Sequence, residues 1–198
     1  MIYGAGQNSQ RRLTKSLARE STGREAKGMK LSTWFQYSWD LKKLPAEAPK
    51  IDARYSVEAA SLEDKALLVA AVSRSVSMEP SWSDDMAARV KLAEEIISTE
   101  FPAGEVTFIA IKHGARIIAT AAIRDAGDKI SNLPVGVCVL NEYRCRGLGT
   151  FLLYDSLRRL RERGLDEARL VTKKGLPAER FLYPKYGGKR VELAVVPV

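Results

Sequence analysis

The run "RCRGLGT" at residues 144–150 has the composition of a loop that binds phosphate. An apolar stretch, "VGVCVL", precedes it, and the apolar residues "FLL" follow it. A strand, a glycine-rich loop and a helix in this order present backbone N–H groups to an anion at the start of the helix. The two glycines allow a close approach because they have no Cβ atom, and the two arginines add positive charge. We therefore expect a phosphate-bearing ligand to contact Arg144, Cys145, Arg146, Gly147, Leu148, Gly149 and Thr150.

Three kinds of glycine-rich loop could explain this run. The nucleoside triphosphate loop has the pattern G-x-x-x-x-G-K-[ST], which the sequence does not contain. The dinucleotide fingerprint G-x-G-x-x-G is half met by Gly147 and Gly149, but Leu152 stands in the place of the third glycine. That fingerprint also needs an acidic residue at the end of the next strand, where "RLVTKK" ends in two lysines. The third pattern, R-x-x-G-x-G followed by a hydroxyl residue, fits residues 144–150.

The longer stretch "VLNEYRCRGLGTFLL" resembles the "V-x-P-E-Y-R-G-K-G-I-G-S-x-L" motif of the GNAT superfamily of N-acetyltransferases. Downstream, "FLYPKYGGK" is similar to the family's "x-L-Y-E-K-x-G-F" motif. The resemblance extends over residues 53–196 and implies an α/β (α+β) fold. In that fold a mixed, mostly antiparallel central sheet is flanked by helices and splayed between its two central strands. The resemblance also implies acetyl-CoA as the co-substrate and an amine as the acetyl acceptor, without a metal.

The resemblance implies direct acetyl transfer in a ternary complex, without an acyl-enzyme. The strand at 135–140 would pair its backbone with the pantetheine arm, through Val139 and Leu140, and offer an N–H to the thioester oxygen. Tyr183 falls on the family's general-acid tyrosine. A phenol with a pKa of about 10 can donate a proton to a departing thiolate of comparable basicity. Tyr186 is the local alternative, but it stands where the family has an apolar residue.

The sequence leaves the general base and the acceptor site open. Glu142 matches a family glutamate that could act as the base, but it could equally be a surface or capping carboxylate. Glu79, Asp84 and Asp85 lie between the first two predicted helices of the domain, a segment that borders the acceptor site in the family. They could attract a cationic amine or simply form a charged helix start. We expect His113 to lie exposed in a hairpin turn.

Hydrophobic periodicity predicts the elements that position these residues. "FQYSWDL" alternates apolar and polar residues, which is typical of a half-buried strand at 34–41. "VGVCVL" is apolar on both faces, which favours a central strand. Further predictions are a helix from Ser61 with Asp64 as its capping partner, a helix at 84–99, a hairpin around "KHGA", a helix at 147–163 ended by Gly164, a strand at 168–173, a helix at 177–186 and a strand at 190–196.

The basic charge is uneven along the chain. The net charge is +8, and residues 1–50 hold ten Lys and Arg against four Asp and Glu. We expect a basic, partly disordered extension at 1–50, with an added strand at 34–41, before an acetyltransferase domain at 51–198. The extension could touch an anionic partner or be a solvated tail. Two alternatives to a small-molecule or peptide acceptor therefore stay open: acetylation of an RNA-borne amine such as aminoacyl-tRNA, and a module that binds acyl-CoA without turnover.

Composition sets further expectations. Apolar runs of at most seven residues are too short for a membrane span of about 20, and no apolar signal core is present, so we expect a cytoplasmic protein. The cysteines at 138 and 145 and the single histidine form no metal ligand set. We expect both thiols to serve packing, since the implied mechanism needs no covalent intermediate.

The sequence departs from the family at its C-terminal end. Only ten residues follow Gly188, which replaces the aromatic residue of the family's "G-F", and Leu176 replaces an asparagine. The family usually has two more strands after this point, and ten residues leave room for one. An unpaired sheet edge is normally covered. We therefore expect residues 34–41 to dock on the core as an added edge strand or a clamp, from the same subunit or from the partner in a homodimer.

Overall fold

The computed structural model describes residues 32–125 and 131–193, which belong to one unit that begins at Ser32. The first strand of this unit is β1 (Trp34–Asp40), followed by the short helix η1 (Leu41–Lys43). The boundary that we predicted between residues 50 and 51 therefore does not separate this strand from the rest of the unit. The expected disorder of the extension falls on residues outside the described part of the chain.

The first sheet has four antiparallel strands in the order β2-β3-β4-β5. They are β2 (Ser56–Ala59), β3 (Thr107–His113), β4 (Arg116–Ile123) and β5 (Val137–Val139). The strands β3 and β4 form the predicted hairpin. The prediction that β5 is a central strand of its sheet is wrong, because β5 lies at the edge. It is apolar because both its faces are covered: Val137 and Val139 pack in one core and Cys138 in another.

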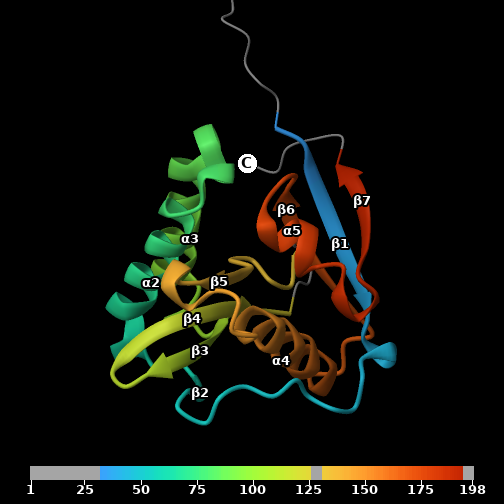
Figure 1. The fold of residues 1–198 in the computed structure, drawn as a ribbon, viewed down its shortest axis with the longest axis horizontal. Helices are drawn as coiled ribbons and strands as arrows, with labels where there is room; N and C mark the ends of the chain where they lie inside the picture. The colour runs from blue at the N-terminus through green and yellow to red at the C-terminus, as the bar shows by residue number, and fades with distance from the viewer. Residues whose placement is uncertain (1–31, 126–130, 194–198) are drawn as a thin grey trace, which may run out of the picture. The chain divides into compact units, whose positions relative to one another are not determined.

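Two helices cover one face of this sheet (Figure 1). The first, η2 (Leu62–Asp64) continuing into α2 (Lys65–Ser77), begins with the predicted capping box, in which the Ser61 N–H donates to the Asp64 carboxylate over 2.9 Å. This bond satisfies a backbone group that the helix itself cannot pair. After η3 (Pro80–Asp85) follows α3 (Met86–Thr99). Leu68 of α2 and Ile97 of α3 are fully buried in the core beneath the two helices.

The long helix α4 (Leu148–Glu162) covers the other face. It follows η4 (Asn141–Tyr143) and the glycine-rich loop. Its Leu153, Leu157 and Leu160 are fully buried, at the helical spacing that the sequence predicts. Gly164 ends the helix with a φ of 89°, a conformation that an L side chain disfavours.

The second sheet has the order β6-β1-β7, with β6 (Glu167–Lys173) and β7 (Lys189–Leu193) on the two sides of β1. Both pairings are antiparallel. Phe35, Tyr37 and Trp39 point from β1 into the core and are at most 5% exposed. The strand at 34–40 is thus an interior strand within its own subunit, and the expectation of an edge strand or clamp is wrong.

The two sheets part between β5 and β6 and lean away from one another (Figure 1). The antiparallel sheets flanked by helices confirm the predicted fold class. None of the helices in the described ranges combines the length and the apolar character that crossing a membrane requires.

The predicted helix at 177–186 is shorter than expected. It consists of α5 (Pro177–Phe181), and the separate turn η5 (Lys185–Gly187) follows. Pro184 disfavours a helical conformation at the residue before it, so the helix ends before Tyr183. Tyr183 therefore lies on the segment between α5 and η5.

Candidate active site

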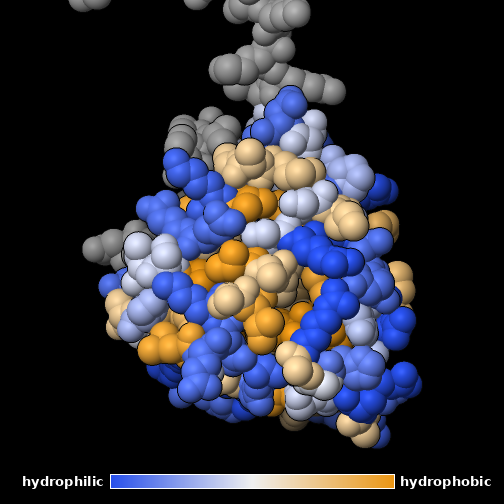
Figure 2. Space-filling view, turned by 90° about the vertical axis from the view of Figure 1, so that its left-hand side faces the viewer, coloured by the Kyte–Doolittle hydropathy of each residue, from blue (hydrophilic) through white to orange (hydrophobic). Residues whose placement is uncertain are grey.

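A pocket of about 330 Å³ opens between β5 and β6, where the two sheets part. Its walls come from β5, the first turn of α4, β6, α5 with the segment after it, and the segment that joins α2 to α3. Most of the lining is apolar, with a few convergent polar groups, as is usual for a small-molecule site. On the side of the molecule shown in Figure 2, apolar side chains likewise gather in the middle and hydrophilic ones border them.

The backbone of β5 turns polar groups toward this pocket. The Leu140 N–H donates to the Ile118 carbonyl of β4 over 2.9 Å. Because antiparallel residues alternate between bonding to the partner strand and pointing away from it, Val137 and Val139 turn their backbone groups away from β4. The Val137 N–H indeed donates to the Tyr183 hydroxyl over 3.3 Å. The Val139 N–H therefore faces the pocket as well.

The loop at residues 144–150 leads into α4 through two left-handed residues, Cys145 with a φ of 60° and Gly147 with a φ of 79°. The N-cap residue of α4 is Gly147, which has no side chain that could cap the first turn. The first backbone N–H groups of a helix have no partner inside the helix. The residues of the first turn of α4, Leu148, Gly149 and Thr150, line the pocket, so these groups lie at its wall. A Cβ at 147 would meet no atom within 4 Å, so the space in front of the loop is free for a ligand.

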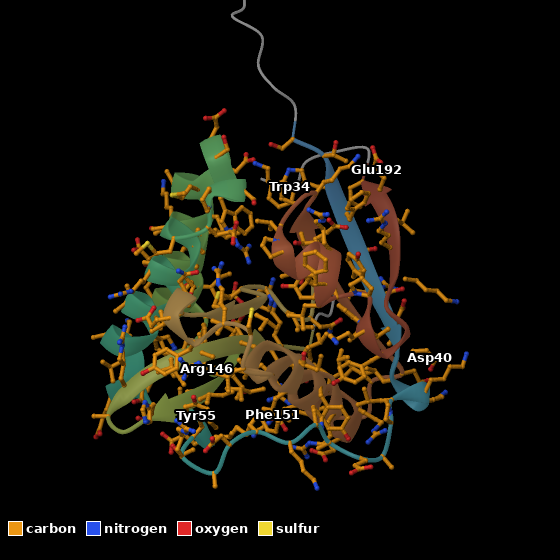
Figure 3. The ribbon with its side chains drawn as sticks, in the orientation of Figure 1. Trp34, Asp40, Tyr55, Arg146, Phe151 and Glu192 are labelled. Carbon is orange, nitrogen blue, oxygen red and sulfur yellow. The ribbon has the colours of Figure 1, made fainter. Side chains whose placement is uncertain are left out.

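The two arginines of the loop have different surroundings. Arg144 turns back from the loop and pairs with Glu79, with 2.7 Å between Nη1 and Oε2. Its Nε also donates to the Val139 carbonyl over 3.4 Å. The exposed Arg146 side chain lies over the Tyr143 ring and donates to the hydroxyl of the buried Tyr55 over 3.4 Å (Figure 3). Arg146 is therefore the more available of the two for a phosphate.

Replacing Arg144 by alanine is expected to lower the free energy of unfolding by about 1–3 kcal/mol, because the buried Glu79 carboxylate loses its charged partner. Urea unfolding measures this change. Arg146→Ala is the matched control, and we expect it to change the free energy of unfolding by at most about 0.5 kcal/mol. If Arg144→Ala were as stable as the parent chain, the pair with Glu79 would not support the fold.

Tyr183 forms the inner wall of the pocket and is 4% exposed. Burial raises the pKa of its phenol to about 12, and the hydrogen bond from Val137 opposes this only in part. The ring packs at 5.7 Å from the ring of Tyr37 and edge-on at 6.2 Å from that of Trp39. Since its oxygen accepts a bond from β5, the hydroxyl proton is available to a ligand in the pocket.

Glu142 does not line this pocket. It is exposed and pairs with Arg116 over 2.8 Å and with Arg74 over 3.5 Å. A hydrogen bond to its own backbone N–H, and then the two guanidinium groups, lower the pKa of the carboxyl. This placement fits the surface alternative and gives no support to a role as the general base.

The three carboxylates predicted at the acceptor site have different surroundings. Glu79 lines the pocket, where burial works to raise the pKa, but hydrogen bonds from Ser81 and Arg144 outweigh it and lower the pKa. Asp85 pairs with Lys173 over 2.7 Å, and Asp84 is exposed. Because the charges of Glu79 and Asp85 are compensated, they do not form an unpaired cluster for a cationic amine.

Sequence reasoning missed two contributions to this site. The first is Arg89 of α3, which reaches the pocket from a helix whose polar face looks ordinary in the sequence. The second is the pair Tyr37 and Trp39 of β1, which support the Tyr183 ring from far away in the sequence. The alternation in 34–41 indicated a buried face but could not indicate what it packs against.

The cysteines differ from one another. Cys138 belongs to the pocket wall, where burial raises the pKa of its thiol to about 11, so the thiol is neutral near pH 7. Cys145 is exposed in the loop, and the expectation that it serves packing is wrong.

A sequence model of the acetyltransferase (GNAT) family matches residues 71–187. Similar solved structures include a GCN5-related N-acetyltransferase from Sphaerobacter thermophilus, with 17% identity, a TM-score of 0.58 and coverage of 92% of this chain and 53% of that one. A GNAT-family acetyltransferase from Colwellia psychrerythraea has 16% identity, a TM-score of 0.55 and coverage of 82% and 54%. A functionally unknown conserved protein from Staphylococcus epidermidis has 16% identity, a TM-score of 0.58 and coverage of 81% and 58%.

The chain thus spans little more than half the length of these three proteins, and at such identities the likeness shows the fold. No protein of curated function matches the chain.

Proposed function

The chain belongs to the acetyltransferase (GNAT) family, and from this premise we propose that it transfers an acetyl group from acetyl-CoA to an amine by direct transfer in a ternary complex. One observation carries the proposal. The uncapped first turn of α4, the Val139 N–H and the Tyr183 hydroxyl all border the same pocket. They suit, in turn, the pyrophosphate, the thioester oxygen and the sulfur of acetyl-CoA.

In the proposed reaction the amine nitrogen attacks the thioester carbonyl carbon. The carbon–sulfur bond breaks, the amine gives up one proton and the sulfur gains one, so the products are an N-acetylated amine and CoA. Negative charge grows on the carbonyl oxygen in the transition state, and the Val139 N–H can donate to it there. The Tyr183 hydroxyl can donate to the departing sulfur.

The high pKa of Tyr183 refines this role. With a pKa of about 12, the phenol is a weaker acid than an alkyl thiol such as the one that leaves. The thiol of a cysteine side chain, for comparison, has a pKa of about 8.5. Complete proton transfer from the phenol to the thiolate would therefore be uphill. We infer that Tyr183 stabilises the sulfur by a hydrogen bond and passes on the proton that the amine gives up.

Replacing Gly147 by valine is expected to weaken CoA binding at least tenfold. The side chain would project into the open space before α4, and each lost hydrogen bond to a charged phosphate is worth about 1.5–3 kcal/mol. Titration calorimetry with CoA measures the affinity. Gly164→Val is the matched control: Gly164 is also left-handed with open space around it, but it lies at the other end of α4. Equal CoA affinity in the two variants would contradict the assignment.

The reaction itself is tested by the release of free CoA over a panel of amines. The panel includes amino acids, peptides, polyamines, aminoglycosides and charged tRNA, so that it covers the small-molecule and the RNA-borne acceptors. Release of CoA with an amine, together with an acetylated product in the mass spectrum, is the expected result. A chain that binds CoA but releases none with any amine would instead be a module that binds acyl-CoA without turnover.

A further inference from the structure

A guanidinium group without a carboxylate partner lies in the wall of the active-site pocket. Arg89 of α3 lines the pocket, and its Nη2 donates to the carbonyls of Pro134 and Val135 over 3.1 and 2.5 Å. The group lies 5.6 Å from the centre of the Trp82 ring. Among the described residues, no carboxylate comes within ion-pair distance of Arg89, whereas the other arginine of the pocket has Glu79.

Arg89 lies beside the reacting end of the pocket. A Cβ built on Gly136 would come 2.9 Å from the Tyr183 hydroxyl and 3.8 Å from Nη2 of Arg89. The phenol that we place at the departing sulfur and the Arg89 guanidinium therefore border the same part of the pocket. The loop at 144–150, which we assign to the pyrophosphate, is a separate part of the wall.

Such a cation favours an anionic ligand. Burial lowers the pKa of Arg89, which means that the protein does not fully replace the hydration of its charge. The two carbonyls occupy one terminal nitrogen and leave the donors of the other two for a ligand. A carboxylate can bind a guanidinium through two parallel hydrogen bonds.

The net charge of the pocket lining also favours an anionic ligand. Among the described residues of its lining, the charged groups are Glu79, Arg89 and Arg144, and the first and the last form a pair. The uncompensated charge is therefore the positive one of Arg89. A polyamine or an aminoglycoside would bring further positive charge close to it, which costs binding free energy.

We propose that Arg89 binds a carboxylate of the amine acceptor, so that the acceptor is an amino acid or another small amine with an acid group. This proposal rests on the acetyltransferase function proposed above. Arg89 reaches the pocket from α3, on the part of the wall that it shares with the Tyr183 hydroxyl.

Matched pairs of amino acids and their C-terminal amides test the proposal. For each pair, kcat/KM is measured with acetyl-CoA for the parent chain, Arg89→Gln and Arg89→Lys. We expect the parent chain to prefer the acid, and the acid-to-amide ratio to fall about 10- to 100-fold in Arg89→Gln and less in Arg89→Lys. The amine of the amide is less basic, but comparing the ratio between variants cancels this difference.

Lys91→Gln is the matched control, since Lys91 is exposed two residues further along α3 and its loss removes the same charge. Its ratio should equal that of the parent chain. CoA affinity, measured by calorimetry, should change less than twofold in both glutamine variants. Thermal unfolding shows whether Arg89→Gln is folded. If it is not folded, the proposal is tested by the acid-to-amide ratio of Arg89→Lys and by that of the parent chain.

An unchanged ratio in folded Arg89→Gln, or a parent chain that prefers the amides, would overturn the proposal and leave the acetyltransferase function standing. A parent chain that binds CoA but turns over no acid of the panel would also overturn it. Absence of CoA binding by the parent chain would contradict the proposed function itself.

A second series of assays, with acetyl-CoA and succinyl-CoA as donors, shows whether the carboxylate that Arg89 binds belongs to the acceptor or to the acyl donor. If Arg89→Gln loses only the use of succinyl-CoA, the group belongs to the acyl donor and the assignment to the acceptor is wrong.

Discussion

Replacing Tyr183 by phenylalanine is expected to lower kcat about 100-fold, the low end of the range for general acid catalysis, while CoA affinity changes little. The hydroxyl lies at the inner wall of the pocket and has its proton free to donate. In the proposed reaction it interacts with the sulfur as negative charge develops there, so its loss should raise the barrier more than it weakens binding. Steady-state kinetics and CoA calorimetry on the same preparation separate the two effects.

Tyr186→Phe is the matched control for this prediction. The Tyr186 hydroxyl donates to the Thr150 carbonyl over 3.4 Å, and its ring packs against that of Tyr154 in α4. It does not line the pocket. We expect its kcat to stay within about threefold of the parent chain. A normal kcat for Tyr183→Phe together with a large loss in Tyr186→Phe would mean that the second tyrosine is the acid.

The pH dependence of kcat follows from the same burial. A pKa of about 12 keeps Tyr183 protonated throughout the range in which the protein can be assayed, so loss of the phenolic proton should not lower kcat below about pH 11. The pKa of Tyr183 is higher in the folded state than in the unfolded chain. The neutral phenol therefore contributes stability that is fully present below pH 10 and is lost as the pH rises from 10 to about 12. The rate should instead rise with pH as the acceptor amine becomes neutral.

Local signals in the sequence were sufficient to predict the elements that hold the glycine-rich loop at 144–150. Two glycines, the apolar run before them and the leucine spacing after them predicted β5, the loop and α4 in nearly their observed positions. The capping box at Ser61 was equally local. In each case the residues that decide the conformation lie within a few positions of one another.

The contacts that sequence reasoning did not find join distant segments. Arg144 belongs to the loop by sequence, but it pairs with Glu79, 65 positions away, and so supports the pocket wall. Arg89 differs from other helix-surface arginines through the segment before β5, where it meets the carbonyls of Pro134 and Val135. Neither partner could be read from composition or periodicity, because both depend on how the helices cover the sheet.

The position of β1 explains a departure from the family motif. A Cβ at Gly188 would overlap the carbonyl oxygen of Tyr183 and lie 2.7 Å from the indole nitrogen of Trp39. The backbone of Tyr183 and the indole of Trp39 thus leave no room for a side chain at position 188. Residues 34–40 occupy the place between β6 and β7.

Replacing Trp39 by alanine is accordingly expected to lower the free energy of unfolding by about 3–5 kcal/mol. The side chain is 1% exposed, packs edge-on to Tyr183 and donates its indole N–H to the Lys185 carbonyl over 3.0 Å. Its removal opens a cavity at the junction of β1 with the segment after α5 and leaves that carbonyl without its partner. Since domains of this size are stable by about 5–15 kcal/mol, such a loss is a large share of the total.

Urea unfolding followed by circular dichroism measures the effect, and Phe181→Ala is the control. Phe181 is a large aromatic residue that is 68% exposed, so its removal should change the free energy of unfolding by at most about 0.5 kcal/mol. Hydrogen exchange gives an independent measurement. Because β1 has a partner strand on each side, its amides should exchange only through global unfolding, at the same free energy as those of β6. If the amides of β1 exchanged much faster than those of β6, or if Trp39→Ala were as stable as Phe181→Ala, then β1 would not be part of the cooperative core and could not support Tyr183.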